Sequence, residues 1–223
     1  MQLWGATMVR NGADVIETFV RHNLRTLDGL AIVDHGSFDG TSEILAALVN
    51  EGLSLRIYRD QEPSFQQSHR MTQVVRETLR DQQADFVFAL DADEFLRVPR
   101  RDLLEAVLMD VPPGMHAVGH WYTYVPDSFE EGAPIGPRHL RRRLKVERRE
   151  AQGYHKVIVS RALLDQPNDR VTDGNHMVAS PDEAWSRPPA RLREDVVVFA
   201  HCPVCIRAQL ESKVILGYLA RPA

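Results

Sequence analysis

The sequence predicts an α/β fold: a mostly parallel central sheet with helices on both faces, extended by a small antiparallel flap. The first observation is that roughly the first ninety residues alternate short apolar runs with stripes of apolar residues at helical spacing, the β-α-β-α-β-α-β order of a parallel sheet. The second is the apolar run 86–90, which passes without a break into Asp91, Asp93 and Glu94. Such a run is typical of a central strand that is covered on both faces.

The elements of the first half follow from these periodicities. Strands are predicted at residues 3–9, 30–33, 53–58 and 86–90. Helices are predicted between them, where apolar side chains recur on one face within residues 16–24, 44–49 and 71–79. Asn11 is expected to cap the first helix. Right-handed crossovers place the carboxyl ends of these strands at one edge of the sheet, so Asp34 and Asp91 are expected to share that edge.

The second half has a looser pattern. A short helix at 103–108 is expected to end at the Pro-Pro-Gly of residues 112–114. An aromatic-rich strand is predicted at 115–124, and further strands at 155–159 and 196–200, the last of which leads into His201. A polar loop at 126–137, a turn at 173–176 and a closing helix at 206–219 complete the chain. We expect the late strands to extend the first sheet and to form the flap.

Composition limits the class of protein. The chain has 223 residues, 43% hydrophobic and 26% charged, which fits one domain over residues 1–223. A net charge of −4 gives no general attraction for nucleic acid or anionic lipid. No apolar stretch approaches the ~20 residues of a membrane span, and the N-terminus lacks the charged region of a signal peptide. We therefore expect a cytoplasmic protein without a transmembrane segment or a nucleic-acid partner.

The carboxylates after residue 90 are the first candidate site. Asp91 and Asp93 are two positions apart, so on an extended tail their side chains point the same way. Two such oxygen donors suit Mg²⁺ or Mn²⁺ that carries a phosphate ligand. The alternative is a solvated turn between a strand and a helix, in which Asp or Glu caps the helix.

Two further patterns have a plain structural interpretation beside a functional one. Residues 138–149 form a dense basic run, which would meet an anionic acceptor or a diphosphate, or would simply be a solvated face. Cys202 and Cys205 are spaced as in a redox dithiol or half of a zinc site. We favour the solvated face for the first and structural thiols near a helix start for the second.

Three stretches, taken together, resemble the family 2 glycosyltransferases of the GT-A fold. They are Met-Val-Arg-Asn at 8–11, Val-Asp-His-Gly-Ser-Phe-Asp-Gly-Thr at 33–41 and Leu-Asp-Ala-Asp-Glu-Phe at 90–95. A looser similarity to a bacterial, family 2-like branch continues through residues 155–156, 174–176 and 201–213. The resemblance implies a nucleotide-diphospho-sugar donor, a divalent metal and inverting transfer to the hydroxyl of a glycan or lipid-linked acceptor. Residues 1–100 would bind the donor, and residues 101–223 would face the acceptor.

The resemblance also implies roles for individual residues. Asn11 and Asp34 would contact the nucleoside of the donor. Asp91 would face the sugar or ribose and, with Asp93, hold the Mn²⁺ or Mg²⁺ ion. Two more side chains have an open interpretation: His201 as a third metal or phosphate contact or a structural histidine, and Arg70 as a phosphate partner or a surface arginine.

Inverting transfer needs a general base, for which the second half offers Asp127, Asp173 and His176. We prefer Asp173 and His176, because their turn contains a glycine that lets the backbone approach a ligand closely. Gly12 and Phe38 depart from the family pattern, which has an acidic and a small polar residue there. Both lie near the expected nucleoside pocket.

Other functions therefore remain open at this point. A nucleotidyltransferase would need a Gly-rich basic phosphate loop, for which residues 10–12 are a weak match. A phosphatase with Asp91 as nucleophile would need Thr or Val after the second Asp, where Glu94 stands. A degenerate GT-A domain that binds a nucleotide or glycan without turnover is the alternative that Gly12 and Phe38 favour.

Overall fold

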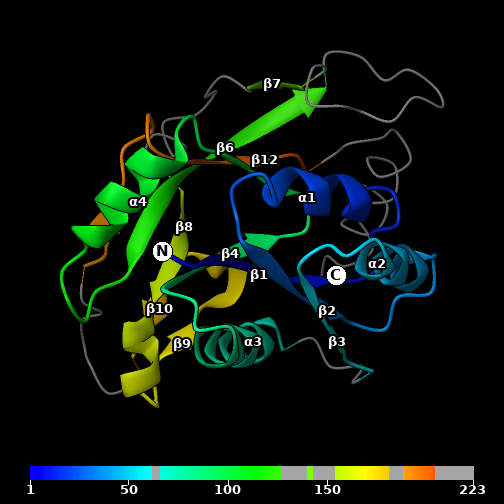
Figure 1. Cartoon of the computed structure of the whole chain (residues 1–223), viewed down its shortest axis with the longest axis horizontal. Helices are drawn as coiled ribbons and strands as arrows, with labels where there is room; N and C mark the ends of the chain where they lie inside the picture. The colour runs from blue at the N-terminus through cyan, green and yellow to red at the C-terminus, as the bar shows by residue number, and fades with distance from the viewer. Residues whose placement is uncertain (62–65, 127–139, 143–153, 181–187, 204–223) are drawn as a thin grey trace, which may run out of the picture.

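A computed structural model describes residues 1–61, 66–126, 140–142, 154–180 and 188–203 (Figure 1). Its main feature is a mixed sheet of ten strands. Eight of them follow the order β3-β2-β1-β4-β8-β6-β12-β5, and the other two, β7 and β11, both pair with β6. A second sheet of two strands stands apart. The predicted α/β class is therefore confirmed.

The first half of the sheet is parallel. It contains β1 (Leu3–Val9), β2 (Gly29–Asp34), β3 (Leu55–Arg59) and β4 (Phe86–Asp91). The chain adds β2 and β3 on one side of β1 and then crosses to add β4 on the other side. The strand order therefore reverses between β1 and β4, and in open α/β sheets such a reversal leaves a crevice at the carboxyl ends of the strands where ligands bind.

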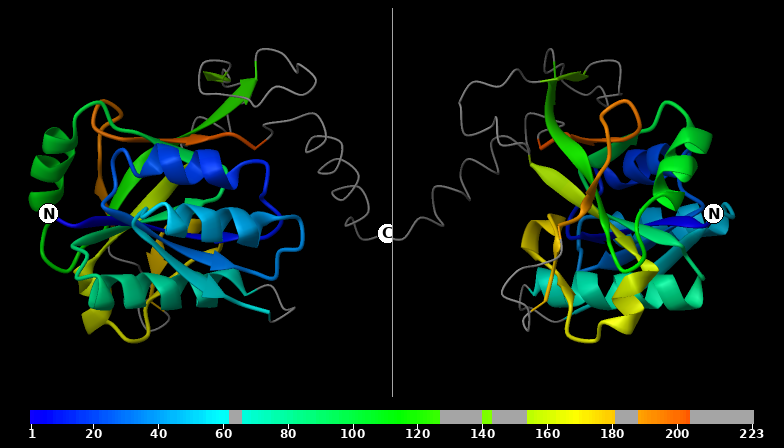
Figure 2. Two further views of the ribbon diagram at one scale, coloured as in Figure 1. Left: turned by 45° about the vertical axis from the view of Figure 1, so that its right-hand side comes forward. Right: turned by 90° about the vertical axis from the view of Figure 1, so that its left-hand side faces the viewer.

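Helices cover both faces of this half, as predicted (Figure 2). On one face lie α1 (Ile16–Asn23) and α2 (Thr41–Asn50), which bury Phe19, Leu45 and Leu48. On the other lies α3 (Gln67–Asp81), which buries Met71 and Val75. A fourth helix, α4 (Arg101–Met109), packs Leu104 and Leu108 into the core that α1 and α2 share.

The late strands extend the first sheet, as expected. They are β8 (His155–Ser160), antiparallel to β4, then β6 (Ala117–Pro126), β12 (Val198–His201) and β5 (Glu94–Arg97). The short strands β7 (Leu140–Arg142) and β11 (Ala190–Arg191) pair with β6. The flap is the antiparallel pair β9 (Arg170–Val171) and β10 (Val178–Ala179), flanked by the 3₁₀ turns η3 (Arg161–Asp165) and η4 (Asp173–Asn175).

Two local predictions are wrong. The helix cap predicted at Asn11 is absent: α1 follows Val15 without a side-chain cap, and Asn11, at φ 54°, accepts a hydrogen bond from the Phe38 N–H instead. The extended tail predicted after Asp91 is a turn at residues 92–93 that leads into β5, a strand which the sequence did not reveal. Asp127, Cys205, most of the basic run and the closing helix lie outside the described residues.

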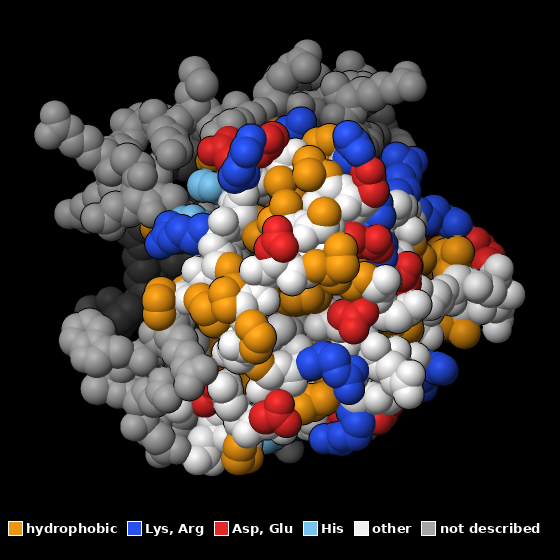
Figure 3. All heavy atoms as spheres, turned by 60° about the vertical axis from the view of Figure 1, so that its left-hand side comes forward, with side chains coloured by type: hydrophobic (Ala, Val, Ile, Leu, Met, Phe, Trp, Pro, Cys, Tyr) orange, Lys and Arg blue, Asp and Glu red, His pale blue; other side chains and the backbone are white. Residues whose placement is uncertain are grey.

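Acidic, basic and apolar side chains are interspersed on the face of the molecule that Figure 3 draws. Among the helices that the structure describes, none has the length and apolar character of a membrane span. The Cys202 side chain is buried, and its thiol lies 3.9 Å from the Ala200 carbonyl.

Stability should fall with acid because of a half-buried histidine, His116. Its Nδ1 accepts a hydrogen bond from the Ser160 N–H at 3.2 Å, and burial lowers the pKa of His116 to about 4. In the unfolded chain this imidazole takes up a proton near pH 6.5. The folded protein therefore has its full stability above that pH and loses the contribution of His116 as the pH falls toward 4. Between pH 7 and pH 5 we expect the free energy of unfolding of the unsubstituted protein to fall by roughly 1–2 kcal/mol more than that of the His116→Gln variant, as measured by urea unfolding. Equal losses in the two proteins would contradict this assignment.

Candidate functional site

The candidate site lies at the carboxyl ends of β1 and β4, where the strand order reverses. In the parallel register, Met8 of β1 is opposite Asp91, and Val9 is opposite Asp34 of β2. The apolar side chains of β4 are buried up to Leu90, and Asp91 is the first residue of the strand that reaches solvent. The structure thus places Asp34 and Asp91 at one edge of the sheet, on either side of β1, as the sequence predicted.

A buried lysine holds the Asp91 carboxylate. The Lys156 side chain is 1% exposed, and its Nζ lies 2.5 Å from Asp91 Oδ2 and 2.8 Å from Glu94 Oε1. It also donates to the carbonyl of Gly174 at 2.8 Å. The other oxygen of Asp91, Oδ1, accepts from Asn175 Nδ2 at 2.9 Å. Asp91 is therefore fixed by partners from β8 and from the turn η4.

Glu94 is the second acidic group of this cluster and is fully buried. It accepts from the Asp91 N–H at 2.9 Å and from Trp121 Nε1 at 2.7 Å, in addition to its ion pair with Lys156. The pKa of Glu94 is raised to about 8, chiefly because the group is buried and then because Asp91 is close, while Lys156 opposes the shift. Burial lowers the pKa of Lys156, but Glu94 and Asp91 outweigh it, so the net shift is upward and Lys156 stays a cation.

Asp93 lies beyond this cluster, beside His201. Their closest atoms, Asp93 Oδ2 and His201 Nε2, are 3.5 Å apart. The pairing of β12 with β5 brings them together, because it sets His201 opposite Glu94, and the Cys202 N–H donates to the Asp93 carbonyl at 2.8 Å. The last strand thus returns to the ligand edge, as the sequence predicted.

The spacing of this pair fits a divalent ion. Two ligands of one ion with bonds near 2.1 Å lie roughly 3–4 Å apart, as Asp93 and His201 do. Within the described residues no cluster of three or more His, Cys, Asp or Glu side chains surrounds a metal position. A site with so few protein ligands suits Mg²⁺ or Mn²⁺, which complete their coordination with substrate phosphates and water.

The turn η4 separates the two residues that were predicted as bases. Asp173 Oδ1 accepts from the Ser68 N–H in the first turn of α3, at 3.0 Å, so it acts as a cap for that helix. His176 Nδ1 lies 2.8 Å from the His155 carbonyl. A carbonyl accepts only, so Nδ1 carries a proton, and in the neutral ring the lone pair is on Nε2. The role of His176 as a base stays a prediction.

Gly174 and Asn175 adopt left-handed conformations in this turn, with φ of 75° and 60°. A Cβ at Gly174 would lie 2.8 Å from His176 Nε2, so a side chain there would crowd the imidazole. The Gly174 N–H donates to Gln67 Oε1 at 3.1 Å, which ties the turn to α3. The glycine therefore serves both the backbone conformation and the space around His176.

The loops after β1 and β2 form one hydrogen-bonded unit at the neighbouring strand ends. Asn11 Oδ1 accepts from the Phe38 N–H at 3.0 Å, and Thr41 Oγ1 accepts from the Gly12 N–H at 2.9 Å. Asp34 Oδ1 accepts from the Ser37 N–H at 3.1 Å, and its Oδ2 accepts from the Ser42 hydroxyl. Both Asp34 oxygens thus brace the loop, and their expected contact with a nucleoside stays a prediction.

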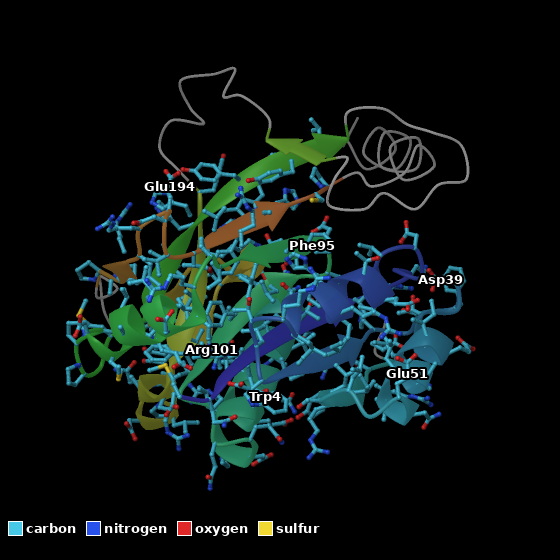
Figure 4. The ribbon with its side chains drawn as sticks, turned by 45° about the horizontal axis from the view of Figure 1, so that its top comes forward. Trp4, Asp39, Glu51, Phe95, Arg101 and Glu194 are labelled. Carbon is cyan, nitrogen blue, oxygen red and sulfur yellow. The ribbon has the colours of Figure 1, made fainter. Side chains whose placement is uncertain are left out.

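Asp39 belongs to the same unit, at the start of α2 (Figure 4). Its carboxylate accepts from the Ala13 N–H at 3.0 Å and from the Thr41 N–H at 3.1 Å. The Phe38 side chain next to it is 82% exposed. Arg70, predicted as a phosphate partner, is 2.7 Å from Asp60 through its Nε. A phosphate would have to share Arg70 with that carboxylate.

The structure therefore gathers Asp91, Asp93, His201 and His176 at one edge, with Asn11 and Asp34 at the adjacent strand ends. The residues that sequence reasoning missed are the partners of the carboxylates: Glu94, Trp121, Lys156 and Asn175. A lysine inside an otherwise apolar strand was the available signal, because an ionised side chain in a buried strand needs a counter-ion.

Comparison with known proteins gives distant structural matches only. No protein-family profile matches the sequence, and no curated protein matches it either. A mannosyltransferase from Pyrobaculum calidifontis, solved with GDP-Man and Mn²⁺, shares 23% identity at a TM-score of 0.40 over 55% of this chain and 35% of its own. TarS residues 1–349 from S. aureus share 16% identity at a TM-score of 0.39 over 60% of this chain and 39% of their own.

A third match is glucosyl-3-phosphoglycerate synthase from Mycobacterium tuberculosis with Mn²⁺, UDP and glucosyl-3-phosphoglycerate, at 17% identity and a TM-score of 0.35. It covers 55% of this chain and 44% of the synthase. The chain thus spans less than half the length of each of these three structures. Likeness at this level assigns no family.

Proposed function

We propose that this chain is a metal-dependent glycosyltransferase that moves a sugar from a nucleoside diphosphate to an acceptor hydroxyl with inversion. The observation that carries the proposal is the Asp93–His201 pair, 3.5 Å apart, beside the fixed Asp91 carboxylate at the strand-order reversal. With a divalent ion held by Asp93 and His201, this arrangement would offer a cation to a diphosphate and the Asp91 carboxylate to a sugar, at the edge where open α/β sheets bind ligands. The sequence resemblance to family 2 glycosyltransferases supports the same conclusion.

Asp93 and His201 are the residues that would hold Mn²⁺ or Mg²⁺. When bound, the ion neutralises the negative charge that develops on the leaving diphosphate. Asp91 is less suited to hold it, because Asp91 Oδ2 is already paired with Lys156 and a second cation there would meet the lysine charge. We therefore assign Asp91 to the hydroxyls of the donor and the metal to Asp93 and His201.

His176 is the residue that would take the acceptor proton. In the transfer, the acceptor oxygen forms a bond to the anomeric carbon while the bond from that carbon to the diphosphate oxygen breaks. The electron pair of the broken bond leaves with the nucleoside diphosphate, and the hydroxyl proton goes to His176 Nε2. The His155 carbonyl holds His176 in the tautomer that this step requires.

A calorimetric panel of UDP-, GDP- and dTDP-sugars, with and without Mn²⁺, tests the proposal. We expect at least one donor to bind about tenfold or more tightly with Mn²⁺, since an ion held by Asp93 and His201 would neutralise charge on the diphosphate. Release of nucleoside diphosphate from that donor would then show turnover. Metal-dependent binding with no release would indicate a non-catalytic binding domain, and no binding by any donor would contradict the proposal.

A further inference from the structure

Three side chains from three neighbouring strands meet on one face of the sheet beside the proposed metal pair. His201 of β12 lies opposite Glu94 of β5. On its other side His201 lies opposite Thr123 of β6, two positions after Trp121. Residues opposite each other, and residues two apart on one strand, have their side chains on the same face of a sheet. The register of the strands therefore brings Glu94, Trp121 and His201 together.

The second ring nitrogen of His201 has no part in fixing the imidazole through a hydrogen bond. Nε2 of His201 faces Asp93 Oδ2 at 3.5 Å, whereas Nδ1 is buried and has no hydrogen-bond partner among the described residues. A histidine that binds a metal usually donates its second ring N–H to a carboxylate or a carbonyl, and this bond fixes the ring. In the described part of the chain, another contact has to set the plane of the His201 imidazole.

That contact is the indole of Trp121. It stacks on the His201 ring with the centroids 4.6 Å apart and the planes 25° apart. The indole is itself held in place, because its Nε1 donates to Glu94 Oε1 at 2.7 Å and Tyr154 packs edge-on against it at 5.4 Å. Glu94 is fully buried and is paired with Lys156. The Trp121 ring is thus tied to the buried cluster that also fixes Asp91.

We propose that Trp121 is a positioning residue for the metal pair: its ring holds the His201 imidazole with Nε2 toward Asp93, and Glu94 holds the indole in that place. This inference rests on the metal-dependent function proposed above. Trp121 acts through His201 and not on the ion itself. Loss of a group that orients a metal ligand typically lowers metal affinity roughly 10–100-fold, so loss of the Trp121 ring should weaken Mn²⁺ binding about tenfold or more.

Titration of the full chain with Mn²⁺, followed through the EPR signal of the free ion, tests the proposal. The titration is done with Mn²⁺ alone and with UDP, GDP or dTDP present. Trp121→Leu and Trp121→Gln both remove the ring and should weaken Mn²⁺ binding about tenfold or more, and either variant suffices if the other does not fold. Trp121→Phe keeps a ring that can stack and loses only the bond to Glu94, so binding should weaken by no more than about threefold.

Tyr124→Leu is the matched control. Tyr124 lies three positions after Trp121 on β6, so its side chain is on the other face of the sheet, and its loss should leave Mn²⁺ affinity unchanged. NMR of the metal-free protein gives a second measurement. The Hα–Hβ couplings of His201 should report one side-chain orientation in the unsubstituted protein and averaging over several in Trp121→Leu or Trp121→Gln. A general loss of stability would not change these couplings in a folded variant.

Three results would overturn the proposal and leave the metal pair in place. They are unchanged Mn²⁺ binding in a folded variant without the ring, a single His201 orientation in that variant, and an equal loss of affinity in Trp121→Phe and Trp121→Leu. A different result separates this inference from the proposed function. If the unsubstituted protein binds no Mn²⁺ with or without a nucleotide, the metal assignment to Asp93 and His201 is wrong, and the role of Trp121 is wrong with it.

Discussion

Asp93→Ala is expected to abolish Mn²⁺-dependent donor binding and to lower turnover by roughly 10²–10³-fold, the usual cost of losing a group that stabilises transition-state charge. Asp93 supplies one of only two protein side chains that we assign to the metal. It lies in the turn between β4 and β5 and is partly exposed, so its replacement removes a ligand and no core volume. Its backbone hydrogen bond to Cys202 remains. Calorimetry with and without Mn²⁺ and the rate of nucleoside diphosphate release measure the two effects.

His201→Ala should act in the same direction, lowering metal-dependent turnover more than metal-free nucleotide binding. A suitable control is Asp110→Ala, which removes an exposed carboxylate at the end of α4 and should change neither quantity. An Asp93→Ala protein that is folded and still binds the donor more tightly with Mn²⁺ would show that the metal, if any, is held elsewhere.

The parallel half of the fold was predictable because each of its elements is specified locally. The run 86–90 is apolar throughout because β4 is buried on both faces, and the stripe of α3 repeats Met71, Val75 and Leu79 along one side of the helix. Handedness of the crossovers then fixes which strand ends meet. The expectation that Asp34 and Asp91 share an edge followed from these rules alone.

The strand β5 was not predictable, because four residues at Glu94–Arg97 carry too little pattern and their partner β12 lies far along the chain. Partners far along the chain also determine the surroundings of Asp91 and Asp93. The sequence shows only that both are carboxylates at a strand end. In the structure, a turn separates them, so that Asp91 contacts Lys156 and Asp93 contacts His201. A spacing of two residues puts two side chains on the same side only where the backbone is extended, and here it turns at residues 92–93.

His201 was placed correctly for a general reason: a β-branched, buried strand that ends in a polar residue delivers it to the carboxyl edge. The sequence left Asp127, Asp173 and His176 open as the general base and favoured the turn that holds the last two. Our proposal of His176 depends on the hydrogen-bond partners that the fold supplies, a helix N–H for Asp173 and a carbonyl for His176. Neither partner is near in sequence, so the sequence alone could not separate the two residues.

Lys156→Met should be the most destabilising single change at the site, at about 3–5 kcal/mol, because it leaves the buried Glu94 and the partly buried Asp91 without their counter-ion. Glu94 is fully buried and Asp91 is partly buried, and Lys156 is the cation between them. Urea unfolding of the metal-free protein measures the cost. The matched control is Arg193→Met, which breaks an exposed ion pair with Asp195 and should have no measurable effect.

The double variant Lys156→Met/Glu94→Gln separates the loss of charge balance from the loss of packing. At pH 9, where Glu94 is largely ionised when Lys156 is present, removing the Glu94 charge along with the lysine should recover at least half of the lost stability, since one buried acidic group no longer needs a partner. The pKa of Glu94 is raised even with Lys156 present, so without the lysine the Glu94 carboxyl holds its proton still more strongly, and the cost of Lys156→Met should grow as the pH rises from 6 to 9. A cost below about 1 kcal/mol at pH 9, or no recovery in the double variant, would show that Lys156 does not balance these carboxylates.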